Sequence, residues 1–337
     1  MRRVLVIFLG LSLTVSIGAQ NKAFLIGVSH YPNGSGWCQL NAHNDVTLLR
    51  ESLSPTWDVS TLEDEQATYD GIVSFLKKAA REVSPGDTVL VHFSGHGQQM
   101  LPIKKDNHDE PDMLDEAIVP YDANIEWSPN YTGQYHLRDN DFGELINAVR
   151  DRAGINGLVI VVLDACHSDS MFKDDETKAC TTEGYRGTTD IFGENITPED
   201  VKKRFLRDTS TIDVNNNSHV LYISACQAES RNAEITDPYG VGYGSLSYAV
   251  ANSIKAGGLD DVDAFLDRIV ISMDTLVPFQ TPGIRASFEY RMPETNQVIT
   301  SSSADSDTPT PNKKPFIIAI ATALAVILLF VWRAKRR

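Results

Sequence analysis

Two apolar runs constrain the fold of this chain most strongly. Residues 88–93 and 158–163 are rich in valine, leucine and isoleucine, and small residues follow each run. Such runs predict buried parallel strands, and open α/β sheets bind ligands at the carboxyl ends of their strands. The segments after the two runs would therefore bring His96 and Cys166 to one edge of a sheet.

Segments of strand and helix character alternate along the chain. Strands are predicted at residues 23–28, 58–62, 88–94, 117–120, 158–163 and 220–224. Amphipathic helices are predicted at residues 44–53, 68–83, 141–153, 245–254 and 262–273, with Thr68 as a capping residue. This order predicts an α/β fold, with a mostly parallel sheet and helices on both faces. Residues 173–217 are polar and lack periodicity, which predicts a mobile loop or an insertion.

Both ends of the chain have the composition of targeting and membrane segments. A basic start, an apolar run and small residues at 18–19 predict a signal peptide, with an uncleaved anchor as the alternative. Near the other end an apolar run precedes a basic tail, which predicts a single membrane pass rather than a buried core helix. The predicted organisation is a signal peptide (1–19), a folded domain (20–293), a polar linker (294–315), a transmembrane helix (316–332) and a cytoplasmic tail (333–337). The folded domain would be exported, to the periplasmic or extracellular side.

The net charge of the chain limits the kinds of partner that it is expected to bind. Lys and Arg number 30 against 45 Asp and Glu, so the net charge is −15. This argues against nucleic acid and favours cationic partners or metal ions. The cysteines Cys38, Cys166, Cys180 and Cys226 have neither disulfide-framework nor zinc spacing. Cys226 ends a strand and is predicted to be a core thiol, whereas pairing of Cys38 with Cys180 stays open.

Cys166 is the candidate nucleophile, because a thiol at a strand end becomes reactive beside a base. His96 is the preferred base, since the adjacent His167 should point to the opposite side of an extended chain. Gly95 and Gly97 flank His96 and offer N–H groups for an oxyanion. The alternative is a buried structural cysteine near an unrelated histidine.

The chain resembles a known family at these same segments. Ser94-Gly95-His96-Gly97 and Asp164-Ala165-Cys166-His167-Ser168 resemble the two signature segments of the caspase-like cysteine peptidases of the metacaspase type. Further likeness is found at residues 26–31, 44–45, 112–122, 223–226 and 280–282. The resemblance extends from about residue 22 to residue 289, so a caspase-like fold is expected for the domain.

The resemblance implies a catalytic dyad of Cys166 and His96 that cleaves peptide bonds through a thioester. The oxyanion donors would be the N–H groups of Gly97 and Cys166. The resemblance also implies cleavage after Arg or Lys, in an acidic S1 pocket formed by Asp45, Ser94 and Asp164. No arginine beside the catalytic segments offsets these acids, although Asp45 could instead be a helix cap. Ala42 departs from the family, because many metacaspases have a pocket cysteine at this position.

A calcium site is also implied by the resemblance. Asp139 and Asp141 resemble a ligand pair of the family, and Asp174 or Asp175 would complete the set. Calcium binds six to eight oxygen atoms, which an acidic loop can supply. The alternative is a solvated acidic surface, since no EF-hand spacing is present.

These features predict a membrane-tethered cysteine endopeptidase whose substrates are proteins or peptides with basic residues. A catalytically silent binding module on the same fold is one alternative, and a cysteine transpeptidase or processing hydrolase of surface proteins is another. Self-cleavage is predicted within residues 173–217, because long polar loops are preferred nicking sites. The basic residues of this segment are Lys173, Lys178, Arg186, Lys202, Lys203, Arg204 and Arg207.

Overall fold

The computed structural model describes residues 19–53, 55, 57–102, 114–165, 184–188, 190–203, 217–226 and 232–291. All of them belong to one folded unit, Met1–Asn296. The expected linker, transmembrane helix and tail, and all of the expected signal peptide except its last residue, lie outside the described residues. Within the described ranges, no helix has both the length and the apolar character needed to cross a membrane.

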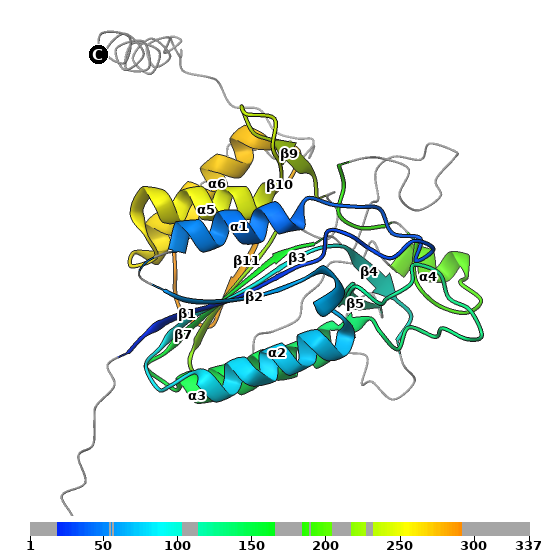
Figure 1. Cartoon of the computed structure of the whole chain (residues 1–337), viewed down its shortest axis with the longest axis horizontal. Coiled ribbons are helices and arrows are strands. Elements are labelled where there is room, and N and C mark those ends of the chain that lie inside the picture. The colour runs from blue at the N-terminus through cyan, green and yellow to red at the C-terminus, as the bar shows by residue number, and fades with distance from the viewer. Residues whose placement is uncertain are drawn as a thin grey trace, which may run out of the picture. The chain divides into compact units, whose positions relative to one another are not determined.

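A six-stranded sheet forms the centre of the described unit (Figure 1). Its strands, in spatial order, are β11 (Gly283–Ala286), β8 (His219–Ser224), β7 (Leu158–Asp164), β3 (Thr88–Ser94), β1 (Asn21–Gly27) and β2 (Asp58–Glu63). Every neighbouring pair is parallel except β11 with β8. The predicted mostly parallel sheet is therefore confirmed, and the two apolar runs are its central strands.

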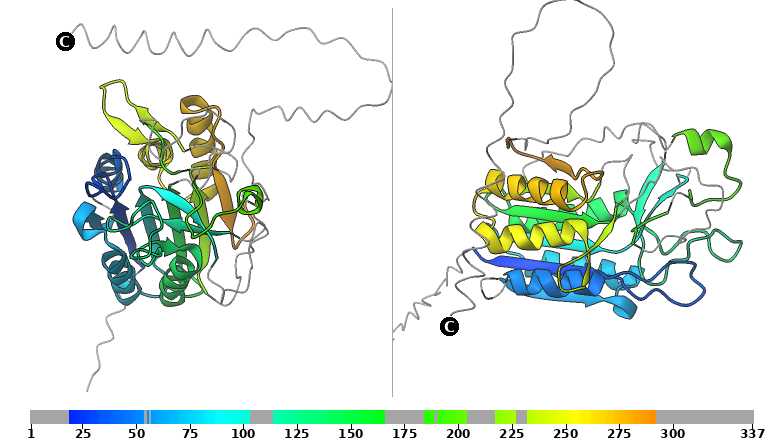
Figure 2. Two further views of the ribbon diagram at one scale, coloured as in Figure 1. Left: turned by 90° about the vertical axis from the view of Figure 1, so that its right-hand side faces the viewer. Right: turned by 90° about the horizontal axis from the view of Figure 1, so that it is seen from above.

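Helices cover both faces of this sheet, as the alternation of segments predicted (Figures 1 and 2). One face carries α2 (Tyr69–Glu82) and α3 (Asp139–Ala153), and the other carries α1 (Ala42–Leu53), α5 (Ser245–Gly257) and α6 (Val262–Leu276). Successive strand residues point to opposite faces. Val91 therefore lies in the core beneath α2 and α3, and Leu90 in the core beneath α1, α5 and α6.

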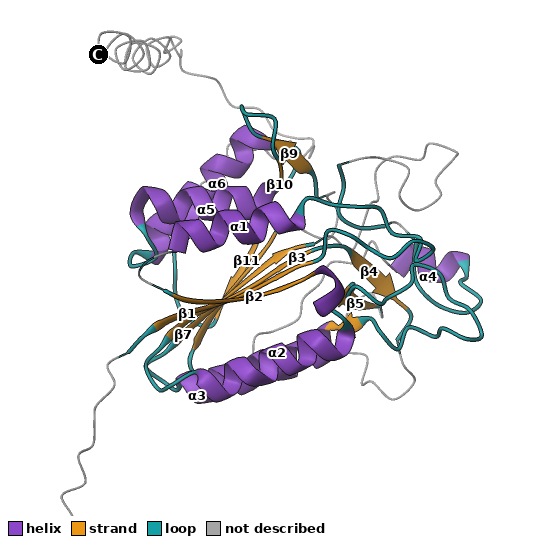
Figure 3. Cartoon of the chain, viewed as in Figure 1, coloured by secondary structure: helices purple, strands orange, loops and turns teal. Residues whose placement is uncertain are grey.

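Several short strands, a 3-10 turn and a short helix lie near the carboxyl ends of the central strands, in a region that also holds many of the loops (Figure 3). They are a three-stranded sheet of β4 (Gly97–Met100), β5 (Asp115–Ile118) and β6 (Leu137–Arg138), a pair of β9 (Glu234–Thr236) and β10 (Gly242–Gly244), the 3-10 turn η1 (Asp64–Gln66) and α4 (Pro198–Lys203). Apart from a short strand at β5, the sequence pattern did not predict them, because elements this short show no clear period.

The described start of α2 confirms the predicted cap. The hydroxyl oxygen of Thr68 accepts a hydrogen bond from the backbone N–H of Gly71 at 3.1 Å. The cap satisfies one of the N–H groups that every helix start leaves free. Apolar residues of α2 then recur on the face that packs against the sheet.

The expectation of a mobile loop does not hold for residues 184–188 and 190–192. Arg186 is fully buried, and Phe192 is 3% exposed. The N–H of Phe192 donates to the carbonyl of Gln99 at 2.8 Å, next to a bridge between Phe192 and Met100. Single buried residues in a polar segment produce no periodic pattern, so sequence periodicity could not reveal this docking.

Candidate active site

The carboxyl ends of three parallel strands lie side by side and place the predicted site residues together. Gly27 of β1 pairs with Ser94 of β3, and Ser94 pairs with Asp164 of β7. Ser94 and Asp164 follow Leu90 and Ile160 by four residues, so their side chains share the face covered by α1 and α5. Cys166 comes two residues after β7 and lies outside the described residues.

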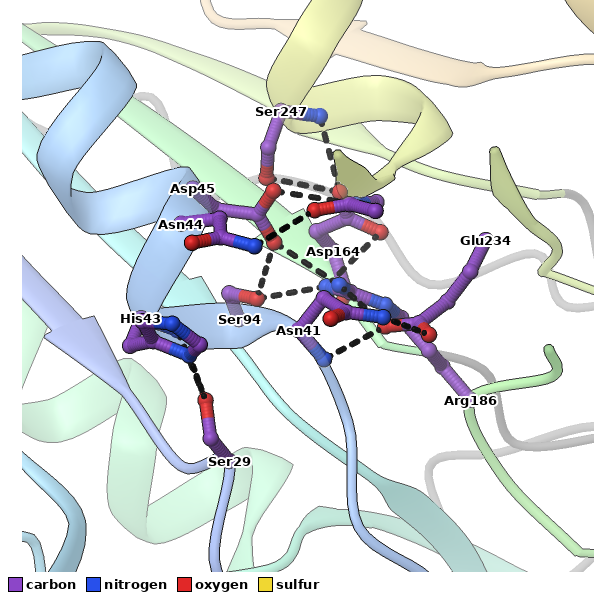
Figure 4. A network of polar contacts seen from close by, with 12 residues as sticks. Ser29, Asn41, His43, Asn44, Asp45, Ser94, Asp164, Arg186, Glu234 and Ser247 are labelled. Carbon is purple, nitrogen blue, oxygen red and sulfur yellow. Dashed lines mark hydrogen bonds and ion pairs between the residues drawn. The ribbon is translucent and has the colours of Figure 1, made fainter. Parts of the chain in front are cut away.

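The three residues predicted for an S1 pocket lie together in one buried cluster, which is called the pocket from here on (Figure 4). Asp45 from α1, Ser94 and Asp164 are all fully buried. The hydroxyl of Ser94 donates to a carboxylate oxygen of Asp45 at 2.7 Å. The N–H of Gly244 donates to the other oxygen at 2.9 Å, and a β-carbon at Gly244 would lie 2.2 Å from Asp164. Glycine at this position therefore permits the close approach of the backbone to the two acids.

An arginine from the same chain fills the pocket, which the sequence did not predict. The Nη2 atom of Arg186 lies 2.8 Å from a carboxylate oxygen of Asp45, and its Nη1 atom donates to the Ser94 hydroxyl at 2.5 Å. The Arg186 side chain has no exposed surface. The expectation that no arginine offsets the pocket acids is therefore wrong, because Arg186 is distant in sequence from the catalytic segments and reaches them only through the fold.

Glu234, the first residue of β9, is a third pocket acid that sequence reasoning missed. One of its carboxylate oxygens lies 2.8 Å from Nη2 of Arg186. The backbone N–H and the side-chain amide of Asn41 donate to Glu234 at 2.8 and 2.7 Å, which fixes the carboxylate in place. Carboxylates bind a guanidinium well when charge and hydrogen bonds are combined in this way.

Asp164 lies farther from the guanidinium than the other two acids. The shortest distance between its carboxylate and Arg186 is 3.6 Å. Its oxygens instead accept hydrogen bonds from the N–H and hydroxyl of Ser247 in α5, at 2.7 and 2.6 Å, and from Asn232 at 2.7 Å. Asp164 thus supplies negative charge to the pocket while its position is fixed by α5 and the segment before β9.

The pKa values reflect burial and the shared guanidinium. Burial raises the pKa of Asp45 to about 7, although Arg186 acts to lower it. Burial also acts to raise the pKa of Asp164, but Arg186 and the hydrogen bonds from Ser247 and Asn232 hold this pKa below its ordinary value. The pKa of Arg186 is raised, because the three carboxylates outweigh its burial. Arg186 is therefore charged, and Asp45 is the pocket acid that titrates near neutral pH.

His96 lies fully buried between β3 and β4, with its tautomer defined by one hydrogen bond. Its Nε2 atom lies 3.0 Å from the carbonyl oxygen of Cys38, and a carbonyl can only accept, so Nε2 carries the proton. The ring stacks on Trp37 at 4.8 Å, and its backbone N–H donates to the hydroxyl of Tyr31 at 3.0 Å. Within the described ranges, Nδ1 has no hydrogen-bond partner. Burial lowers the pKa of His96 to about 4, so the ring is neutral at pH 7.

The glycines that flank His96 differ in their surroundings. Gly97 begins β4, opposite Ile118 of β5. The N–H of Gly95 donates to the carbonyl of Asp164 at 3.3 Å, so this donor is already engaged. A β-carbon at Gly95 would lie 2.8 Å from the ring of Phe93, which excludes larger residues here. Of the two flanking donors, Gly97 therefore remains the candidate for the oxyanion.

Gln280, from the segment that resembles the closing motif of the family, links two backbone segments beside the pocket by hydrogen bonds. It is fully buried, and its amide nitrogen contacts the carbonyl of Ala225 at 2.8 Å and the side chain of Asn232 at 3.0 Å. Its amide oxygen accepts from the N–H of Ala233 at 2.9 Å. Gln280 thereby fixes the short segment that leads into β9 and Glu234.

Asp139 and Asp141 begin α3, where negative charge is favoured by the helix dipole. Asp141 is exposed, and the third expected ligand, Asp174 or Asp175, lies outside the described residues. The described ranges contain no group of three side chains that could hold a metal ion. The calcium site therefore stays a prediction, because its third expected ligand lies outside the described residues.

Two cysteines can be placed beside the site. Cys38, whose carbonyl accepts from His96, is disulfide-bonded. Cys226 follows β8 and is half-buried rather than fully enclosed in the core.

Comparison with known proteins agrees with this geometry. The profile of the caspase domain family (Peptidase_C14) matches residues 20–324. The chain belongs to this family. Metacaspase-2 of Trypanosoma brucei brucei is 25% identical over 239 residues, which are 68% of this chain and 60% of the relative. Metacaspase-7 of Arabidopsis thaliana is 28% identical over 167 residues, which are 47% of this chain and 36% of the relative. The predicted metacaspase-type resemblance is therefore confirmed.

A solved structure supports the fold of this caspase domain. Protein GSU0716 from Geobacter sulfurreducens superposes with a TM-score of 0.52 at 20% identity, over 79% of this chain and 93% of the other. At this identity the match shows the fold alone. The chain spans about 60% of the length of the Trypanosoma metacaspase, so the activity of that whole protein comes to this chain only as a proposal.

Proposed function

We propose that this caspase-domain protein is a cysteine endopeptidase that cleaves after arginine or lysine. One observation carries the proposal. The buried guanidinium of Arg186 lies among Asp45, Glu234 and Asp164. It lies at the carboxyl ends of β3 and β7, the strands after which His96 and Cys166 follow in the chain. A pocket that binds an arginine of its own chain has the size, charge and acceptor positions to bind an arginine of a substrate.

The proposed mechanism uses Cys166 as the nucleophile and His96 as the base. Because Nε2 of His96 carries the proton, the lone pair on Nδ1 is available to accept the proton of the thiol. The thiolate attacks the carbonyl carbon of the residue whose side chain fills the pocket, and the N–H groups of Gly97 and Cys166 stabilise the oxyanion. His96 then gives its proton to the leaving amine, and water hydrolyses the thioester. General acid–base catalysis of this kind contributes about 10²–10⁴ in rate.

Proteolysis would test this proposal directly. The purified full-length chain, in detergent, is given fluorogenic peptides that differ only at the residue before the cleaved bond: Arg, Lys, citrulline or Asp. Citrulline keeps the shape of arginine without its charge. A charged group inside a buried pocket is worth about 2–5 kcal/mol, so we expect Arg to exceed citrulline at least 30-fold in kcat/KM. Preference for Asp would refute the proposal, and peptide binding without cleavage would support the silent binding module.

The proposed enzyme acts outside the cytoplasm, anchored by one transmembrane helix. Support comes from the apolar runs at residues 4–17 and 316–332 and from the basic tail that follows the second run. Alkaline extraction of membranes should leave the intact chain in the pellet and release a chain that stops at residue 315. If both forms are released, the anchor is refuted.

A further inference from the structure

His92 is a fully buried histidine of β3 that the proposed chemistry does not use. It lies two residues from both Leu90 and Ser94, on the strand face that α1 and α5 cover. Its Nε2 atom lies 2.9 Å from the hydroxyl oxygen of Ser247 in α5. Burial of a polar ring is costly unless the ring is hydrogen-bonded, so the contact with Ser247 needs an explanation.

The Ser247 hydroxyl links His92 to Asp164 of the pocket. The same hydroxyl oxygen lies 2.6 Å from a carboxylate oxygen of Asp164, and the backbone N–H of Ser247 donates to that carboxylate oxygen at 2.7 Å. The other oxygen of Asp164 accepts from the side-chain amide of Asn232 at 2.7 Å. Figure 4 shows the hydroxyl and the N–H of Ser247 both directed at Asp164. His92, Ser247 and Asp164 therefore form one buried chain of hydrogen bonds that ends in the pocket.

A hydroxyl has one proton to donate, and this limits the chain to two arrangements. If the hydroxyl donates to Asp164, the carboxylate is ionised and Nε2 of His92 donates to the hydroxyl oxygen. If the hydroxyl donates to Nε2 instead, Asp164 must carry a proton, and so must Nδ1 of His92. Within the described ranges Nδ1 has no hydrogen-bond partner, so a proton there would be a buried donor without an acceptor. The first arrangement is therefore favoured, and in it Asp164 is ionised.

Burial and the neighbouring charges agree with this arrangement. Burial lowers the pKa of His92 to about 4, so the ring is neutral at pH 7 and has one N–H to donate. Burial acts to raise the pKa of Asp164, but the guanidinium of Arg186 and the hydrogen bonds to the carboxylate hold this pKa below its ordinary value. Asp45 and Glu234 are the other titratable groups around the same guanidinium.

We propose that His92 is a positioning residue for the selection of basic substrates. By donating to Ser247, it reserves the hydroxyl proton for Asp164, which keeps this pocket acid charged and fixed toward the side chain of a substrate arginine or lysine. This inference rests on the proposed function. The competing explanation is packing alone, in which His92 only fills space between the sheet and α5.

Two substitutions separate the hydrogen bond of His92 from its packing. His92→Gln places an amide N–H close to the position of Nε2, whereas His92→Leu fills a similar volume without a donor. Neither new side chain titrates, so a pH-dependent difference between the two chains cannot come from the side chain at position 92 itself. His219→Leu, at the amino end of β8 and away from the pocket, is the control for the loss of a histidine.

The first experiment needs no catalysis, because it measures unfolding of the full-length chain by urea at a series of pH values. A carboxylate whose pKa is lowered in the folded state stabilises the fold above its ordinary pKa, and this contribution is lost as the pH falls through the folded-state pKa. Without the donor at position 92, the pKa of Asp164 should rise by about one pH unit. His92→Gln should therefore be more stable than His92→Leu near pH 7, and the difference should shrink below about pH 5. A difference that is absent, or equal at every pH, would overturn the proposal.

The second experiment measures substrate selection in chains that also carry Arg186→Gln, so that no arginine of the chain itself fills the pocket. The ratio of kcat/KM for arginine and citrulline peptides is followed as the pH is lowered. The fall near neutral pH belongs to Asp45 and should be common to both chains. The further fall at lower pH should lie about one pH unit higher in His92→Leu than in His92→Gln. Equal profiles in folded chains would overturn the proposal.

Ser247→Ala tests the path of the effect. If His92 acts through the hydroxyl, His92→Gln and His92→Leu should give the same pH dependence of unfolding in chains that also carry Ser247→Ala. A pH-dependent difference that survives Ser247→Ala would overturn the chain of hydrogen bonds. The two proposals fail differently: if no chain cleaves any arginine peptide, the proposed function fails, whereas the unfolding experiment decides independently whether His92 keeps Asp164 ionised.

Discussion

Replacement of Glu234 by glutamine tests whether β9 contributes to the preference for basic residues. The Glu234 side chain is 10% exposed, and its carboxylate lies 2.8 Å from the Arg186 guanidinium. Glutamine keeps the size of the side chain and one oxygen acceptor, but it removes the charge. Arginine substrates should therefore lose affinity and rate, whereas uncharged substrates should lose little.

The distance between the Glu234 carboxylate and the guanidinium sets an upper limit on the loss of binding energy. Two unit charges 2.8 Å apart attract by about 6 kcal/mol at an effective dielectric constant of 20. Most of that is offset, because the new glutamine side chain would still accept a hydrogen bond and because Asp45 and Asp164 lose a like-charged neighbour. The net value of a hydrogen bond to a charged group, about 1.5–3 kcal/mol, is the better guide. It corresponds to a fall of about 10- to 150-fold in kcat/KM.

The assay is the ratio of kcat/KM for arginine and citrulline peptides, measured on chains that carry Arg186→Gln, so that no arginine of the chain itself fills the pocket. Glu234→Gln should lower this ratio, and Glu51→Gln, on the exposed face of α1, should not. Melting temperatures exclude a loss of fold. An unchanged ratio in the folded variant would mean that Glu234 binds only the chain's own arginine and does not select substrates.

The remaining predictions concern the nucleophile, the other acids and calcium. Cys166→Ala should lower peptidase turnover by about 10⁴ or more with an unchanged melting temperature, as measured by peptide cleavage and circular dichroism. Asp164→Ala should reduce arginine preference and also lower the melting temperature by several degrees, because the donors of Ser247 and Asn232 lose their acceptor. Cleavage after arginine should rise with pH through about 7 as Asp45 ionises, and Asp45→Asn should remove that limb of the profile. We also predict that calcium raises activity after chelation, and that Asp139→Ala with Asp141→Ala abolishes the response; equal rates with and without calcium would contradict this.

The sheet and its helices could be predicted because their residues repeat with clear periods. The apolar runs of β3 and β7 are long enough to specify buried strands, and Thr68 marks the start of α2. Because the carboxyl ends of parallel strands lie at one edge of a sheet, the strand assignments also predict which side chains lie close together. This logic, together with the family resemblance, predicts that Ser94, Asp164 and Asp45 share one pocket.

The occupant of the pocket could not be predicted in the same way. Arg186 lies in a polar segment without periodicity, and Glu234 begins a strand of three residues. Their meeting depends on pairing between residues 184–186 and 232–234, which is a long-range contact with no local signal. One weak signal did exist, because a basic residue in the segment after the nucleophile is what an acidic pocket would bind. The sequence offered seven such residues and no means to choose among them.

The titration of Asp45 links the charge of the pocket to its occupant. Burial raises the pKa of Asp45 and the charge of Arg186 lowers it, so the pKa of about 7 belongs to the pocket that holds a guanidinium. Well below pH 7, Asp45 is protonated and contributes no charge to the binding of a basic side chain. As the pH rises through about 7, Asp45 ionises and attracts the guanidinium, so the pocket should bind an arginine side chain more tightly at higher pH.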